Sequence, residues 1–471
     1  MGTGIRVPGM VRDWRAAAGC LAVVLASGPA LTEAEEPATQ EPACCRVAYR
    51  LEVDGELFAS AGPENAPLTQ AISLSARFDF DELPAGPDNS AATGRRYQEA
   101  AATLAIDGES HHRELAADAG SLFVAVEGTT PLPFLADGFL SRSEAELLDL
   151  PFDPVLLERL SPGEPVAEGS SWTIGADLVA GLLAIDTVET GTLEATLDEV
   201  ADGTGQVSFE GTVHGAVDGV STRIAVSGSF QAPVSPGKLA DTWQLAAGLS
   251  QLKVSLAERR QAGWVAPGLD VEATIRISRT GDAEVRPAET AQLAPPLQER
   301  PAGPGRPGHV WHQHPHGRYS LAIDRRWRVV EDGPNGLVMR LVDRGMLVAQ
   351  CSILPLPRGD ANSPATVEQV QRDVERSLGS QFGRVAEAES LTRSDGTRVV
   401  RVVADGTAEG RPFRWIHHVL TDPHGYRAAV TCMLEPAMLE RFAVADSELV
   451  AGLTLLPDRP RAAARPAAAP R

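Results

Sequence analysis

Residues 72–80 read ISLSARFDF, and this alternation of apolar and polar side chains sets the fold of the first half of the chain. Successive side chains of a strand point to opposite faces, so every second residue of the stretch lies on one side. The same period of two returns in residues 269–277, LDVEATIRI. Such strands have one buried face and one face in water, as an antiparallel sheet presents them. The apolar residues of the first stretch are Ile72, Leu74, Ala76, Phe78 and Phe80.

Two dipeptides between alternating runs indicate how these strands connect. Asp54-Gly55 and Asp218-Gly219 are the residue types that a two-residue hairpin turn requires. The pattern therefore predicts a curved antiparallel β domain over residues 45–279.

A leucine-rich stretch interrupts the strand pattern at residues 143–160, SEAELLDLPFDPVLLERL. Ser143 with Glu146 predicts a capping box, and Asp153-Pro154 predicts the start of a second helical turn. A short helical pair on a sheet can be a lid over an apolar ligand, or a plug that covers the apolar face of the sheet. The candidate ligand-binding residues are Leu147, Leu148, Leu156 and Leu157.

After residue 308 the pattern changes to mixed helix and strand. Thr366 with Gln369 predicts a capped amphipathic helix, and residues 436–451 predict a terminal helix. Stretches such as TRVVRVVADG, residues 397–406, predict antiparallel strands between them. The expected fold class is α+β, with an α/β/α sandwich around an antiparallel sheet over residues 309–456.

The two ends of the chain and one internal segment differ in composition from these domains. Residues 1–34 have arginines before a short apolar run and small residues after it, as in a secretory signal peptide cleaved near Ala30 or Ala34. No later stretch is long and apolar enough to predict a transmembrane span. Residues 280–308 predict a proline-rich linker, and residues 457–471 a disordered tail. The expected location is periplasmic or secreted.

The net charge of −21 is distributed unevenly. Residues 309–456 contain 18 acidic and 17 basic residues, and the tail adds four arginines against one aspartate, so residues 1–308 carry −23. A surface this acidic repels nucleic acid and anionic lipid headgroups, so nucleic acid is not an expected partner.

The stretch HVWHQHPHGRY, residues 309–319, is the strongest candidate for a metal site. In an extended chain His312, His314 and His316 share a face, which is a spacing that metal ligands use. An ordinary polar strand beginning fits the same residues. The motifs GxSxG, HExxH, CxxC and the Walker loop are absent, so the sequence predicts no catalytic residue and no cofactor.

Four cysteines follow the predicted signal peptide. No CxxC spacing supports a redox or metal role for Cys44-Cys45. Cys351 and Cys432 each lie among apolar residues of a predicted strand, so both are expected in the core as slowly reacting thiols. If their strands are neighbours, a disulfide can form instead in an oxidising compartment.

The order of these segments resembles known families. From YRLEVDGEL to AERRQAGWVAPGLDVEATI the chain is similar to uncharacterised secreted proteins of planctomycete-like bacteria, and its sheet with inserted helices resembles the half-barrel of LolA- and LppX-type lipoprotein carriers. From PHGRYSLAIDRRW to ERFAVADSELVAGLTLL it resembles the PsbP/DcrB-like α/β/α sandwich, whose members act as accessory or binding modules. The resemblances imply binding of a lipid or acyl chain and argue against catalysis.

Two hypotheses on function follow. The first is a non-enzymatic envelope protein that binds an apolar ligand, a lipid or envelope component, or a partner protein. The second is a metal carrier or metal-dependent enzyme centred on His312, His314 and His316.

Overall fold

The computed structural model describes residues 45–59, 68–83, 92–217, 219–239, 241–246, 248–261, 267–281, 305–360 and 365–457. The predicted signal peptide, most of the predicted linker and the predicted tail lie outside these residues. Among the described residues, 45–310 and 343–346 belong to one compact unit, and 311–342 and 347–457 belong to another. We call them the N-terminal and C-terminal units. The domain boundaries drawn from the sequence stay a prediction.

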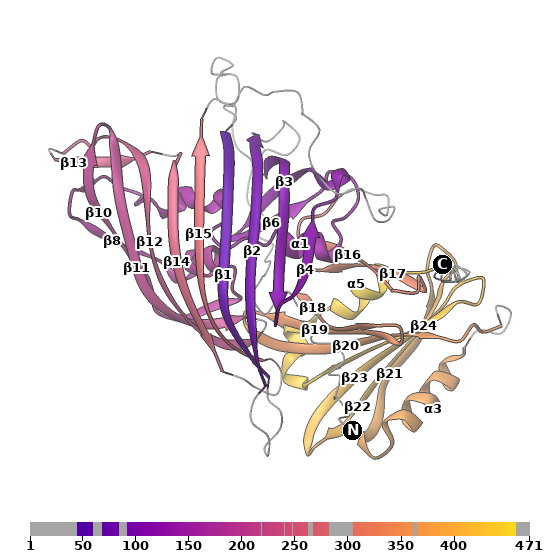
Figure 1. Cartoon of the computed structure of the whole chain (residues 1–471). Helices are drawn as coiled ribbons and strands as arrows, with labels where there is room; N and C mark the ends of the chain where they lie inside the picture. Colours follow the sequence, from indigo (N-terminus) through magenta and orange to yellow (C-terminus); the bar gives the residue numbers. More distant parts are fainter. Residues whose placement is uncertain are drawn as a thin grey trace, which may run out of the picture. The chain divides into compact units, whose positions relative to one another are not determined.

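The N-terminal unit is built on one antiparallel sheet of 15 described strands, with the main order β6-β5-β3-β2-β1-β15-β14-β12-β11-β10-β8 (Figure 1). Strands β4, β7, β9 and β13 pair off this path. The strands are β1 (Cys45–Ala59), β2 (Leu68–Leu83), β3 (Ala92–Ile106), β4 (Glu109–Glu114), β5 (Ser121–Glu127), β6 (Thr130–Phe134), β7 (Val166–Ala167), β8 (Ser171–Ile174), β9 (Thr187–Thr190), β10 (Leu193–Ala201), β11 (Thr204–Val217), β12 (Val220–Pro236), β13 (Thr242–Leu245), β14 (Gln251–Arg260) and β15 (Gly268–Thr280).

The alternation in the sequence correctly predicted which side chains of this sheet are buried. In β2, Leu74, Ala76, Phe78 and Phe80 are buried, and the polar residues between them are not. In β15, Leu269, Val271, Ile275 and Ile277 are buried in the same way, whereas Ala273 is half-buried. Burial of one face fixes the register, because a slip by one residue would turn every apolar side chain toward water.

Of the two predicted hairpin turns, one is confirmed and the other is wrong. Strands β11 and β12 are joined at Val217 and Val220, and Gly219 has a φ of 76° that suits a turn. Asp218 itself lies outside the described residues. By contrast, Gly55 lies inside β1, where a Cβ atom would be 2.2 Å from the carbonyl oxygen of Asp270. The glycine has no Cβ atom and so permits the close approach of β15. The dipeptide Asp54-Gly55, taken alone, had suggested a turn.

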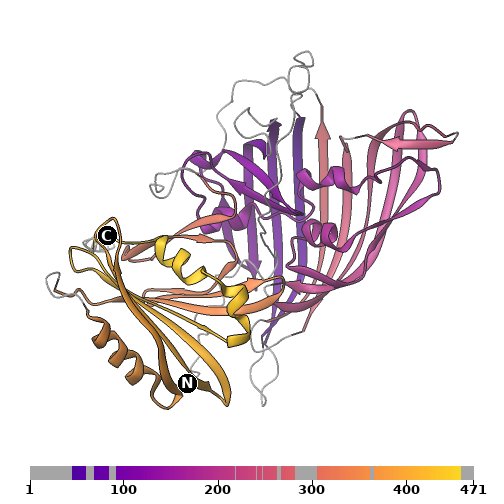
Figure 2. The ribbon, with the colours of Figure 1, turned by 180° about the vertical axis from the view of Figure 1, so that it is seen from behind.

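The helical segments of this unit lie on one face of the sheet (Figure 2). The insertion is confirmed as helical, but its first capping box is formed by Ser141 and Glu144, two residues before the predicted pair Ser143 and Glu146. Asp153 caps the second segment as predicted. The segments are η3 (Ala117–Ala119), α1 (Arg142–Leu147), η4 (Pro154–Leu160) and α2 (Ala176–Leu183).

The C-terminal unit has a seven-stranded antiparallel sheet, β18-β19-β20-β24-β23-β22-β21, and a three-stranded sheet, β16-β17-β25. Its elements are β16 (His309–Gln313), β17 (Tyr319–Asp324), β18 (Trp327–Gly333), β19 (Gly336–Asp343), β20 (Met346–Leu356), α3 (Val367–Leu378), η5 (Gly379–Gln381), β21 (Phe382–Thr392), β22 (Arg398–Ala408), β23 (Arg411–Thr421), β24 (Arg427–Leu434), η6 (Pro436–Met438), α4 (Leu439–Phe442), α5 (Ala445–Ala451) and β25 (Leu453–Leu455).

The predicted α+β fold class, with its C-terminal α/β/α sandwich, is wrong. Strands account for 62% and helices for 15% of the described residues, and the strands form three sheets. Helix α3 begins at the predicted Thr366 capping box and packs on Val400 and Val402. The expected terminal helix is interrupted at Ala443, whose φ is 45°, and the segment forms η6, α4 and α5, next to a sheet that includes β17 and β25.

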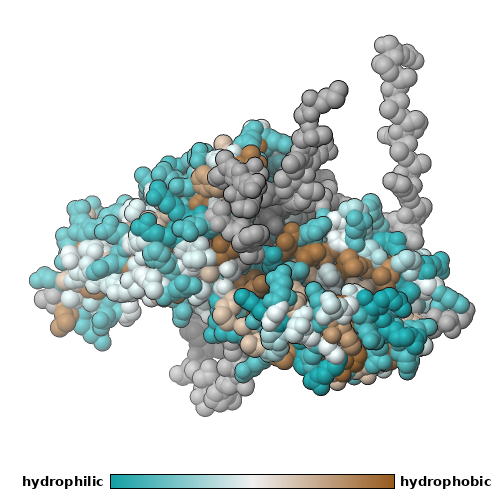
Figure 3. All heavy atoms as spheres, turned by 90° about the horizontal axis from the view of Figure 1, so that it is seen from below, coloured by the Kyte–Doolittle hydropathy of each residue, from teal (hydrophilic) through white to brown (hydrophobic). Residues whose placement is uncertain are grey.

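The surface is mainly hydrophilic in the view of Figure 3, with smaller apolar patches between the hydrophilic residues. Most exposed large apolar side chains, such as Leu68 and Leu239, are separate in the sequence, which is usual for folded proteins; Met346 and Leu347 are adjacent. Within the described residues, no helix has the length and apolar character that crossing a membrane would need.

Candidate functional site

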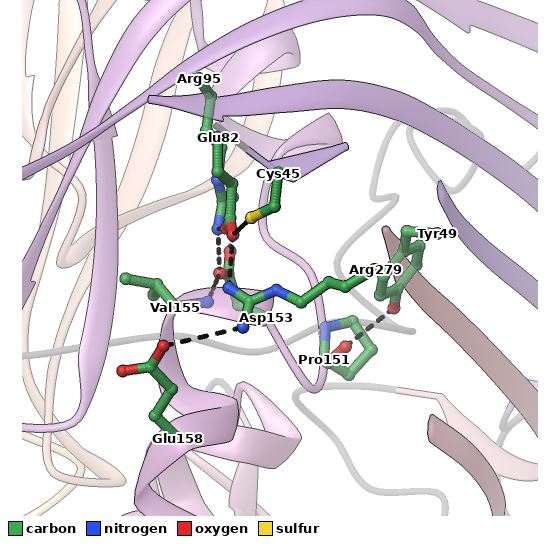
Figure 4. A network of polar contacts seen from close by, with 9 residues as sticks. All are labelled: Cys45, Tyr49, Glu82, Arg95, Pro151, Asp153, Val155, Glu158 and Arg279. Carbon is green, nitrogen blue, oxygen red and sulfur yellow. Dashed lines mark hydrogen bonds and ion pairs between the residues drawn. The ribbon is translucent and has the colours of Figure 1, made fainter. Parts of the chain in front are cut away.

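The most polar part of the N-terminal core lies where the helical insertion meets the sheet (Figure 4). Arg95 of β3 has a side chain that is 1% exposed, and it donates to both carboxylate oxygens of Asp153, with Nη1 at 2.9 Å from Oδ2. Its guanidinium also lies 3.6 Å from Glu82 of β2 and 4.8 Å from the centre of the Phe80 ring. Burial disfavours the charge of Arg95, but the ion pair with Asp153 outweighs it and raises the pKa of Arg95.

Two further arginine contacts complete this group, which we call the Arg95 cluster: Arg95, Asp153, Glu82, Arg279 and Glu158. Arg279 of β15 donates to Glu82 and lies 3.9 Å from Glu158 of η4. The thiol of Cys45 is 3.5 Å from Glu82. Each carboxylate in the cluster is paired with an arginine, so the cluster holds elements together and has no carboxylate available as a general base.

Asp153 makes two structural interactions in this cluster. Its side chain accepts a hydrogen bond of 2.9 Å from the backbone N–H of Val155, which caps η4. The same carboxylate binds Arg95, so the cap that starts the helical segment also attaches it to β3.

The turn before Asp153 is attached to its surroundings at three points. Tyr49 of β1 donates a hydrogen bond of 2.8 Å from its hydroxyl to the carbonyl oxygen of Pro151. The N–H of Phe152 donates to the carbonyl oxygen of Leu182 in α2, and its ring stacks on Phe209 at 5.9 Å. Phe152 is fully buried with a φ of 54°, a conformation that a bulky residue rarely adopts. Packing therefore holds this turn in a conformation that is unfavourable in isolation.

The first helix of the insertion is attached in a similar way. Glu146 of α1, whose side chain is 3% exposed, accepts from Arg142 at 2.6 Å and from Arg113 of β4 at 3.0 Å. Ion pairs to the sheet thus anchor both halves of the insertion.

The candidate ligand-binding leucines belong to the two helical segments of the insertion or lie next to them. Leu147, Leu148, Leu156 and Leu157 are all at most 2% exposed. Full burial fits a closed lid as well as a plug, so their role in binding a ligand stays a prediction. The sequence analysis did not predict the Arg95 cluster. The one signal in the sequence was Arg95 itself, a charged residue at the start of the stretch RRYQEAAATLAI.

The three candidate metal ligands do not share one face. Strand β16 ends at Gln313, so His312 and His314 are buried while His316 is exposed in the following turn. His314 packs on the Tyr319 ring at 4.9 Å, and its Nδ1 accepts from the backbone N–H of His316 at 3.2 Å. Burial and the nearby His316 lower the pKa of His314. Among the described residues, no group of three or more His, Cys, Asp or Glu side chains could hold a metal ion.

A second pair of histidines also lies in the C-terminal unit. His418 is buried and bonds Asp446 of α5 at 2.9 Å. His417 points to the opposite face, where its Nδ1 is 3.0 Å from the Thr431 hydroxyl. Burial, together with His418, lowers the pKa of His417 to about 4.

This shift predicts a loss of stability in acid. Because the folded state binds the proton of His417 less tightly than the unfolded state, stability falls as the pH drops from about 6.5 to about 4. We expect His417→Gln to remove roughly 2–3 kcal/mol of this loss in urea unfolding of the full chain at pH 4 and pH 7. His424→Gln, at an exposed turn, is the control and should leave the pH dependence unchanged. An equal acid loss in His417→Gln would contradict the assignment.

Comparisons with known proteins do not assign the chain to a family. No protein-family model and no curated protein matches it. A solution structure of cyanobacterial PsbP (CyanoP) from Synechocystis is similar to 31% of this chain over 92% of its own length, at 13% identity and a TM-score of 0.26. A protein of unknown function from Pseudomonas aeruginosa matches 32% of this chain at 16% identity and a TM-score of 0.20.

A structure of lipovitellin, described for its lipid–protein interactions, matches 57% of this chain at 8% identity and a TM-score of 0.30. This chain covers 27% of that lipovitellin chain. The expected likeness to PsbP thus has a counterpart among solved structures. At these TM-scores none of the similarities supports an argument on function.

Proposed function

We propose that this chain is an exported, non-enzymatic binding protein of the cell envelope that holds an apolar ligand, such as an acyl chain, between the large sheet and the helical insertion. The observation that supports this proposal is the way in which the insertion is attached. Its leucines are buried, and the buried ion pair between Arg95 and Asp153 attaches it to β3.

When the insertion moves away from the sheet, the free-energy cost of exposing its leucines differs from the cost of opening the Arg95 cluster. Exposing a leucine side chain to water costs about 2 kcal/mol, and this cost is removed if an apolar ligand covers the leucine instead. A buried ion pair contributes little net free energy, because desolvation offsets most of its attraction, and its charges regain water when it opens. The Arg95 cluster therefore fixes where the insertion closes without making opening prohibitive, and an acyl chain stabilises the open state.

The lengths of the insertion helices and of the neighbouring α2 fit this role. Helix α1 has 6 residues, η4 has 7 and α2 has 8. Isolated helices this short are not stable in water, so their conformation depends on what they pack against. A ligand that replaces the sheet as the packing partner can keep them folded in a lifted position.

The export part of the proposal is supported by the signal peptide that the sequence predicts over residues 1–34. The metal hypothesis is not retained, because the described part of the chain presents no ligand set, and metal analysis of untagged protein is its direct check.

The proposal predicts that weakening the Arg95 cluster speeds ligand capture. In Asp153→Asn the helix cap is kept, since asparagine caps as well as aspartate, but the charge that neutralises Arg95 is lost. The loss destabilises the closed state, with the insertion against the sheet, relative to the open state. The association rate of the fluorescent fatty acid parinaric acid should therefore rise at least about tenfold in stopped-flow measurements.

The matched control is Asp270→Asn, which removes an exposed partner of Arg259 at 3.3 Å and should change the rate by less than about twofold. Absence of saturable binding to the unaltered protein would contradict the proposed function. Equal association rates in all three proteins would contradict the lid.

A further inference from the structure

The polar face of the large sheet, opposite the insertion, contains a row of four cations. Arg77, Arg50, Arg276 and Lys253 occupy directly paired positions on the adjacent strands β2, β1, β15 and β14 (Figure 1). Neighbouring strands are about 4.8 Å apart, and directly opposite like charges destabilise a sheet. Such a row needs an explanation, particularly since residues 1–308 carry a net charge of −23.

Only part of this charge is neutralised within the described residues. Arg50 pairs with Asp79 at 2.8 Å, and Arg276 has a longer contact of 3.7 Å with Glu52. Arg77 and Lys253 are exposed and have no ion pair with any described residue. The two ends of the row therefore have positive charge available for an anion.

A hollow of about 510 Å³ lies over part of this row. Its lining includes Arg50, Arg276 and Lys253. Beside the cations runs a second paired row, in which Ser278 faces Gln251, Gln251 faces Gln231, and Gln231 faces Gln206. All four of these residues line the hollow. Amide and hydroxyl groups both donate and accept hydrogen bonds, so they match sugar hydroxyls placed next to the anionic groups.

We propose that this hollow, with the four cations, binds a short acidic oligosaccharide, a sugar chain whose carboxylate, sulfate or phosphate groups contact the cations while its hydroxyls contact the glutamine row. The net charge of −23 on residues 1–308 repels a long polyanion, which favours a ligand of a few sugar units. Nucleic acid fits less well, because Phe230 is the sole aromatic residue of the lining and is 1% exposed, so no ring is available for base stacking. The site lies on the face away from the insertion and does not depend on the proposed apolar ligand.

Titration calorimetry of the full chain tests this site with a galacturonate tetrasaccharide, with uncharged maltotetraose and with inorganic phosphate. The acidic tetrasaccharide should bind saturably, more weakly at higher salt, and at least about tenfold more tightly than either of the others. Lys253→Gln should weaken its binding about fivefold, and the double change Arg77→Gln with Lys253→Gln at least about twentyfold.

The control is Arg259→Gln, on the same strand and the same face as Lys253, where the cation is already paired with Asp270. It should change the affinity by less than about twofold. If maltotetraose or phosphate binds as tightly as the acidic sugar, or if Lys253→Gln binds like Arg259→Gln, the proposal is wrong. A sulfated tetrasaccharide that binds more tightly than galacturonate would support the site and identify the anionic group.

Discussion

Arg95→Met is expected to lower the free energy of unfolding of the N-terminal unit by about 3–5 kcal/mol, because it leaves the buried carboxylate of Asp153 without its cation. Methionine retains the unbranched aliphatic part of the side chain, so the loss reports mainly the charge. Pulse-labelling hydrogen exchange along a urea series measures it on the full chain, since peptides of β1, β2 and β3 report this unit alone.

The double variant Arg95→Met with Asp153→Asn separates charge from packing. With both charges removed and the helix cap retained, most of the lost stability should return. Arg259→Met, in an exposed ion pair, should cost less than about 1 kcal/mol. If the double variant loses as much free energy of unfolding as the two single variants together, the pair stabilises the unit through packing. The proposal that the Arg95 cluster can open at low cost would then lose its basis.

Oxidation of Cys351 and Cys432 is expected to stabilise the C-terminal unit by about 4 kcal/mol. The two residues are directly opposite each other on β20 and β24, and both are fully buried. Opposite Cα atoms on antiparallel strands are about 4.5–5.5 Å apart, within the range of a disulfide. The bond would close a loop with 80 residues between the cysteines, which sets the magnitude.

The structure has both cysteines as free thiols, and their predicted burial is confirmed. The hydrogen bond with Cys351, followed by burial, raises the pKa of the Cys432 thiol, so the reduced pair should react slowly with alkylating reagents. Protein collected from an oxidising compartment should yield no alkylated product at either residue after denaturation, and dithiothreitol should lower its urea midpoint. Cys351→Ala with Cys432→Ala should be insensitive to dithiothreitol. Alkylation of both residues in denatured, unreduced protein would contradict the disulfide.

The sheet of the N-terminal unit could be predicted because its information is local. Alternation in residues 72–80 gives the strand and its buried face without reference to any partner. The leucine-rich insertion and its Asp153 cap were also readable, because capping depends on neighbours two or three residues away.

What failed depends on distant contacts. Gly55 looked like a turn because the approach of β15, some 215 residues later, cannot be seen in a dipeptide. The sandwich prediction failed because β25 pairs with β17, far away in the sequence. The Arg95 cluster joins β2, β3, β15 and η4, and the cation row becomes a row only once four strands are in register. The hydrophobic periodicity of a strand shows which of its faces is buried, whereas these sites also depend on which distant strands pair and in which register.

Photo-crosslinking with a diazirine-bearing fatty acid is the most direct test of the claim that an apolar ligand lies between sheet and insertion. We expect saturable labelling that unlabelled fatty acid abolishes, with adducts mapped by mass spectrometry to residues 141–160 and to the buried side chains of β1 and β2 facing them. Adducts confined to the polar face of the sheet or to the C-terminal unit, or labelling that does not saturate, would contradict it.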